Sequence, residues 1–137
     1  MNRKDLRAIA RIRLREARVL LREGLYSGAY YLTGYAAECG LKACIAKLTR
    51  MHDFPDKERG NKCFTHDLVA LVRLASLDAS LRAEMAADRV FELNWSLVRD
   101  WNEQSRYETR SRRQAEDIFS AAANRQHGVM RWVRRHW

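Results

Sequence analysis

The strongest constraint on the fold is a stretch at residues 26–45, YSGAYYLTGYAAECGLKACI, whose only charged side chains are Glu38 and Lys42. These two lie four residues apart with the carboxylate first, an order that stabilises a helix. The glycines and alanines of the stretch keep its backbone narrow, so that neighbouring helices can approach closely. A helix without a charged face is normally surrounded by other helices. The sequence therefore predicts a central buried helix, in which the lone carboxylate of Glu38 needs a partner.

The chain has 137 residues, which favours one domain over residues 1–137 with a single core. One proline and six glycines are too few for the many turns of a sandwich or barrel. No stretch shows strand-like alternation of useful length. We therefore expect an all-α domain, an antiparallel up-and-down bundle of four to five helices.

The first half of the chain is expected to form a helical hairpin. Apolar residues at helical spacing predict a first helix over residues 3–23, and Gly24 supplies its C-terminal stop. Residues 25–49 form the second helix, which the short turn makes antiparallel to the first. Arg13 stands in the apolar stripe of the first helix, so we expect its side chain to point into the bundle.

The second half begins with a polar loop at residues 50–64. Thr65 is expected to be the N-cap of the next helix. A longer helix over residues 79–104 carries a stripe of large apolar side chains. After a connection at residues 105–110, Ser111 opens a capping-box pattern, S-x-x-Q, for a final helix.

The formal charge of +9 and the pI near 10.0 suit an anionic partner such as RNA, DNA or a nucleotide, although arginine can also serve solubility alone. The three cysteines include no C-x-x-C pair, and we interpret them as reduced core residues. Neither a signal peptide nor a membrane span is apparent. We therefore expect a cytoplasmic protein without membrane contact.

A metal site is the first chemical candidate, because His52, Asp53, Cys63 and His66 lie close together in the sequence. Cys63-x-x-His66 has the spacing of a ligand pair. However, no second tight pair accompanies it, and helix capping already explains the residues around His66. There is also no glycine-rich phosphate loop. We expect neither a metal nor a cofactor.

Metal-independent RNA cleavage needs a base for the 2′-hydroxyl and a cation for the developing phosphorane charge. A histidine and an arginine can meet both needs, and Arg131-x-x-x-x-His136 places the two five positions apart. They are candidate catalytic residues. The alternative is a solvated basic tail, because the segment RWVRRH is rich in arginine.

A third constellation lies where the tryptophan-rich helix ends. An arginine beside an aromatic ring, such as Arg106 beside Tyr107, can hold a phosphate while the ring stacks on a base. The alternative is a structural connector in which Arg106 pairs with Glu38 or Glu103. We hypothesise that Arg13 and Arg106 converge on Glu38. The candidate ligand-binding residues are Arg13, Glu38, Trp101, Arg106 and Tyr107.

Several of these motifs together resemble the HEPN-domain proteins of prokaryotes. The resemblance covers nearly the whole chain, and the segment GYAAECGLKACI carries its most specific part. The matching segments are R-x-x-x-A-x-x-L-L-x-x-G-x-Y-x-x-A-Y at residues 13–30, GYAAECGLKACI at 34–45, THDL at 65–68 and RY at 106–107.

The resemblance implies a helical bundle that forms homodimers. The family includes toxin ribonucleases, ribonucleases of defence systems, partners of minimal nucleotidyltransferases and nucleotide-binding members. For this chain it implies a nucleotide- or RNA-binding component of a prokaryotic toxin–antitoxin or defence module, often paired with a minimal nucleotidyltransferase.

The ribonuclease members carry an arginine followed after four to six residues by a histidine, late in the third main helix. Here residues 79–104 contain no histidine, and Arg99 is followed at that distance by Glu103 and Gln104. Binding without catalysis is therefore favoured. The alternatives are an endoribonuclease, using Arg131 and His136 or an arginine-led site, and a non-catalytic helical dimerisation scaffold.

Overall fold

The computed structural model describes residues 1–51 and 62–137, and every regular element in those ranges is a helix, which confirms the all-α prediction. The elements are α1 (Arg3–Arg22), α2 (Tyr26–Met51), α4 (Leu68–Leu74), α5 (Asp78–Ala87), α6 (Arg89–Arg99), the 3₁₀ helix η1 (Glu103–Tyr107), α7 (Arg112–Ala123) and α8 (Val129–Arg134).

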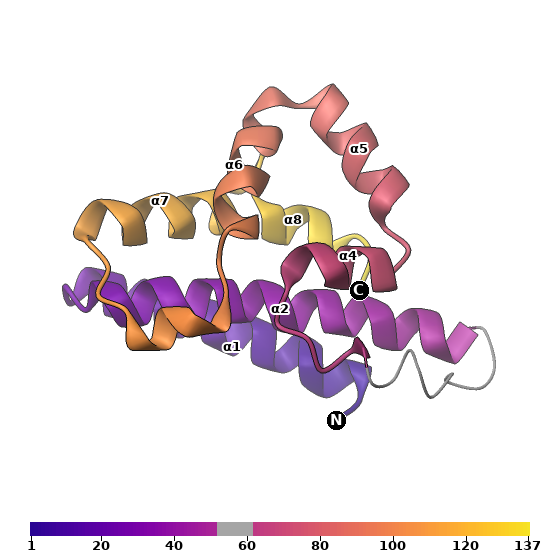
Figure 1. The fold of residues 1–137 in the computed structure, drawn as a ribbon, viewed down its shortest axis with the longest axis horizontal. Coiled ribbons are helices and arrows are strands. Elements are labelled where there is room, and N and C mark those ends of the chain that lie inside the picture. The colour runs from indigo at the N-terminus through magenta and orange to yellow at the C-terminus, as the bar shows by residue number, and fades with distance from the viewer. Residues whose placement is uncertain (52–61) are drawn as a thin grey trace.

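Helix α2 is the central element, as its sequence predicts. It contacts α1 along its length and also meets α4, η1, α7 and α8. Figure 1 shows α1 and α2 side by side along the long axis, with α5 and α6 rising away from them. The α1–α2 turn contains Gly24 at φ 76°, a left-handed conformation that glycine adopts without strain. No helix in the described ranges combines the length and apolarity that a bilayer crossing requires.

The inward orientation expected for Arg13 is wrong. The buried stripe of α1 consists of Ala10, Leu14 and Ala17, whereas Arg13 is partly exposed and donates to Glu16 at 2.8 Å. Leu14 occupies the inward position one turn after Ala10, as a period of 3.6 residues requires. Arg13 therefore lies beside the stripe.

Two expected long helices are each divided. Asp88 separates α5 from α6 with an extended backbone, and its carboxylate caps α6 by accepting from the Phe91 amide at 3.1 Å. The final helix begins at the expected capping box of Ser111 and Gln114, but it stops before Gly128. At Gly128 a Cβ would lie 2.3 Å from the Asn124 carbonyl oxygen, so this turn requires glycine.

The N-cap of α4 is Asp67, and the prediction of Thr65 is wrong. The Asp67 carboxylate accepts from the amides of Val69 and Ala70 at 3.0 and 3.3 Å. The Thr65 hydroxyl instead accepts from the Asp67 amide at 3.1 Å. Thr65 lies too far before the first helical residue, Leu68, to reach the free amides of the first turn.

Candidate functional site

The buried carboxylate of Glu38 forms the centre of the candidate site. Glu38 is 2% exposed, and Lys42, one turn later on α2, donates to it at 2.8 Å. His66, from the segment before α4, places Nδ1 3.0 Å from each carboxylate oxygen. The carboxylate for which the sequence predicts a need of partners therefore has two, Lys42 and His66.

Glu38 fixes the orientation of the His66 ring. Because Nδ1 is engaged by the carboxylate, Nε2 is the nitrogen left for a ligand or a proton transfer. The His66 side chain is 42% exposed and borders a hollow of about 430 Å³. Arg99, at the end of α6, lines the same hollow. A histidine oriented by a carboxylate, with a guanidinium nearby, is an arrangement that can bind a phosphodiester or assist its cleavage.

The other groups around the hollow are mostly acceptors. Asp67, Asp100 and Glu103 line it against the single guanidinium of Arg99, so its charge does not favour a bare phosphate. The Asp67 carboxylate is already engaged in capping α4. Free carboxylates can accept hydrogen bonds from ribose hydroxyls or base amino groups, while arginine can hold a phosphate. The hollow therefore suits a whole nucleotide better than an isolated phosphate.

Trp101 borders this hollow but offers it no open ring face. The residue is 2% exposed, and its ring covers Gly34 and lies 5.9 Å from the Tyr31 ring, centroid to centroid. Its buried Nε1 has no hydrogen-bond partner in the described part of the chain. Trp101 is thus placed to hold the start of η1 against α2, with its ring turned into the core.

The structure does not bring Arg13 and Arg106 to Glu38. Arg106 is exposed, and its guanidinium carbon lies 5.2 Å from the centroid of the Tyr107 ring. Tyr107 is 76% exposed, so its other face is open to solvent. Arg13 is engaged by Glu16. The hypothesis that the two arginines converge on Glu38 is therefore wrong, since Lys42 and His66 occupy that carboxylate.

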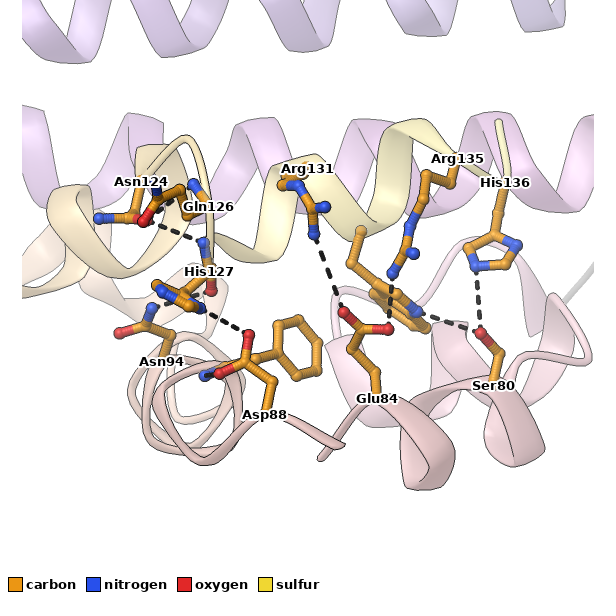
Figure 2. A network of polar contacts seen from close by, with 12 residues as sticks. Ser80, Glu84, Asp88, Asn94, Asn124, Gln126, His127, Arg131, Arg135 and His136 are labelled. Carbon is orange, nitrogen blue, oxygen red and sulfur yellow. Dashed lines mark hydrogen bonds and ion pairs between the residues drawn. The ribbon is translucent and has the colours of Figure 1, made fainter. Parts of the chain in front are cut away.

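Arg131 and His136 each have a separate partner on α5 (Figure 2). Helix α8 ends at Arg134, so the two do not share a helix face. The Arg131 guanidinium lies 3.9 Å from Glu84, and His136 Nε2 lies 3.1 Å from the Ser80 hydroxyl. The basic segment is therefore docked against α5 and is not a freely solvated tail.

Ser80 links His136 to Trp132. Trp132 Nε1 donates to the Ser80 oxygen at 3.1 Å, and the same hydroxyl is hydrogen-bonded to His136 Nε2 at 3.1 Å. Burial, followed by the nearby cations Arg135 and Lys47, lowers the pKa of His136. A ring that favours the neutral form and is hydrogen-bonded to Ser80 fits a structural tie between α5 and the last residues.

The cysteines of α2 are core residues. Both Cys39 and Cys44 are buried, and neither forms a disulfide. Burial raises the pKa of Cys39 to about 11 and that of Cys44 to about 12. Protonated thiols are poor nucleophiles, so the structure favours core filling over cysteine chemistry.

Two of the possible metal ligands, His52 and Asp53, lie outside the residues that the structure describes. Within the described ranges, no group of three or more His, Cys, Asp or Glu side chains is arranged to hold a metal ion. His66 is instead engaged by Glu38.

Sequence reasoning missed His66 and Arg99 as neighbours. His66 was considered only as a metal ligand beside a helix cap, and Arg99 only as an arginine without a following histidine. The sequence holds no signal that distinguishes these two residues from the other histidines and arginines of the chain. Only the tertiary fold brings the segment before α4 and the end of α6 to one hollow.

The central, mostly apolar helix α2, its buried Glu38 and the helices around it define a small all-α domain. A HEPN domain profile matches residues 4–136, nearly the whole chain. The chain belongs to the HEPN domain family. No curated protein and no solved structure matches it.

Proposed function

We propose that this HEPN-family protein binds a nucleotide, free or as a unit of RNA, in the hollow beside His66. The observation that carries the proposal is the Glu38–His66 pair, which fixes a half-exposed imidazole at the rim of a polar hollow that Arg99 also lines. The phosphate would lie against Arg99 and His66 Nε2. The net charge of +9 favours such a ligand from a distance.

The proposal predicts that Arg99→Gln abolishes nucleotide binding while leaving the fold intact. A ligand that binds only the folded state stabilises it by about 2.7 kcal/mol at one hundred times its Kd, so AMP, ATP or GTP should raise the melting temperature of the parent protein. Arg99 is exposed and forms no ion pair within the described ranges, so its loss should not alter the unliganded melting temperature.

Arg82→Gln, an exposed position on α5 away from the hollow, is the charge-matched control and should keep the full shift. The proposal fails if no nucleotide shifts the parent protein, or if Arg99→Gln shifts as much as Arg82→Gln does.

Metal-independent RNA cleavage is a second candidate function, favoured specifically by the orientation of His66. His66 Nε2 would accept the proton of the attacking 2′-hydroxyl, and Arg99 would stabilise the charge on phosphorus. If so, cleavage should persist in EDTA and fall by about 10²–10⁴ in His66→Ala. His136→Ala is the comparison: a loss in that variant alone would favour the Arg131–His136 alternative.

We also propose a homodimer that works in the cytoplasm with a nucleotidyltransferase partner in a toxin–antitoxin or defence module. Membership of the family supports this assembly. So does an exposed apolar stripe on α6, formed by Val90, Leu93 and Leu97 at helical spacing. Light scattering measures the oligomeric state. A dimer that neither binds nucleotides nor cleaves RNA would favour the alternative of a non-catalytic dimerisation scaffold.

A further inference from the structure

A second surface, on α1, carries arginines without acidic partners. A groove of about 390 Å³ is lined by one apolar residue and four arginines: Leu14, Arg11, Arg15, Arg18 and Arg134. None of the four forms an ion pair with a carboxylate in the described part of the chain. The nearest acidic residue on α1, Glu16, is engaged by Arg13.

Aromatic rings hold two of these arginines in place. The guanidinium carbon of Arg11 lies 4.9 Å from the centroid of the Trp137 ring, and that of Arg18 lies 5.7 Å from the Phe119 ring. Trp137 also contacts Arg7, one turn earlier on α1, at 5.5 Å. Stacking uses the face of a guanidinium and leaves its N–H edges free for oxygen acceptors. These groups are therefore pre-positioned for an anion.

The groove concentrates positive charge. Burial, and after it the neighbouring Arg11, lower the pKa of Arg134. Like charges that remain close together without an acid raise the free energy of the folded chain, and a bound polyanion would relieve this repulsion.

The spacing of the arginines suits a linear polyanion. Arg11, Arg15 and Arg18 stand at i, i+4 and i+7, and span about 10 Å along α1 at a rise of about 1.5 Å per residue. We propose that this groove binds the phosphodiester backbone of a nucleic-acid strand, with its guanidinium groups on successive phosphates. A single strand can lie within a groove of this kind, whereas a flat anionic membrane would contact only its rim.

The inference extends the proposed function. The hollow beside His66 would take one nucleotide, and the groove would hold the strand. No groove residue lines that hollow, so the two sites can be tested separately.

The test is a triple variant, Arg11→Gln, Arg15→Gln and Arg18→Gln, measured by fluorescence anisotropy with labelled single-stranded RNA and DNA 12-mers between 50 and 200 mM salt. Each phosphate contact to a single strand contributes about 0.7 to the slope of log K against log salt. Loss of three contacts should therefore flatten the slope by about 2 and weaken binding at least tenfold. Comparing the RNA and DNA arms shows which strand the groove prefers.

The matched control replaces three exposed arginines outside the groove with glutamine: Arg82, Arg113 and Arg125. It should weaken binding less than about threefold, because only the overall electrostatic field of the protein changes. A triple Arg→Lys variant of the groove keeps the charge and covers the case in which the glutamine variant fails to fold. It should bind more weakly than the parent protein because lysine lacks the bidentate fork. Equal losses in the groove and control triples would overturn the inference.

Two further measurements separate this inference from the nucleotide site. The groove triple should keep its thermal shift with ATP. Arg99→Gln should lose that shift, yet replacing the three groove arginines in the Arg99→Gln background should still flatten the salt slope for the 12-mers by about 2. If mononucleotides fail to bind but the 12-mers bind through the groove, the groove inference stands without the nucleotide site. Groove-dependent binding to phosphatidylserine vesicles, with no binding to either 12-mer, would overturn the inference in favour of a membrane surface.

Discussion

Gly34→Ala is expected to lower the free energy of unfolding by about 2–3 kcal/mol, the upper part of the range of about 1–3 kcal/mol that overpacking a core usually costs. The new Cβ would lie 2.1 Å from Cγ of Trp101, the first ring atom, which no rotamer change moves far. Trp101 is 2% exposed and cannot swing into solvent without opening the core. Urea denaturation of the purified variant measures the loss.

Gly28→Ala is the matched control on the same helix. Its Cβ would approach only Cδ1 of Leu20, at 3.2 Å, the far end of a flexible side chain. Because alanine is favoured over glycine in a helix interior by about 1 kcal/mol, this variant should be neutral or slightly more stable. Equal losses in the two variants would contradict the close contact between α2 and Trp101.

Much of the fold could be predicted because its signals are local. The capping box at Ser111 and the stop at Gly24 depend on neighbouring residues alone, and the structure has both. The breaks at Asp88 and Gly128 were missed because the apolar periodicity continues through them. The local features that mark the turns, the Asp88 cap and the glycine at position 128, were given less weight than this periodicity.

The site was predictable only in part. The composition of α2 identifies Glu38 as a buried carboxylate that needs partners, and one partner, Lys42, follows from helical spacing. The other, His66, is 28 residues away, and its approach depends on how the chain returns from α2 to α4. The positive charge of Arg106 also suits a partner of Glu38, but in the structure Arg106 stacks on Tyr107.

The arginine groove shows the same limit. The sequence gives the spacing of the basic residues on α1, which also fits a solvated face. The placement of Trp137 and Phe119 beneath Arg11 and Arg18 distinguishes the two possibilities, and those rings come from the other end of the chain. The sequence therefore predicts the spacing of the arginines, whereas the contacts of Arg11 and Arg18 with the two rings depend on the tertiary fold.

Glu38→Ala is expected to lower the free energy of unfolding by about 2–3 kcal/mol. Removing one partner of a fully buried ion pair costs about 3–5 kcal/mol, and this cost is reduced here because Lys42 and His66 can reach solvent. Their side chains are 21% and 42% exposed, against 3% for Glu38. Chemical denaturation monitored by far-UV circular dichroism measures the change.

Glu38→Gln separates the structural role of this carboxylate from its role in positioning His66. The glutamine keeps the shape and one acceptor oxygen, equivalent to Oε1, which both Lys42 Nζ and His66 Nδ1 approach. It loses the negative charge and the acceptor at Oε2, which His66 Nδ1 also approaches. We expect a loss of about 1 kcal/mol in stability, as for one hydrogen bond, together with weaker nucleotide binding. Lys42→Met is the control, because it removes the other donor and leaves the Glu38–His66 contact in place. If both variants lose stability but only Glu38→Gln loses the thermal shift with ATP, Glu38 supports ligand binding by positioning the His66 ring. Unchanged binding in Glu38→Gln would instead make the carboxylate a purely structural anchor of the segment that leads into α4.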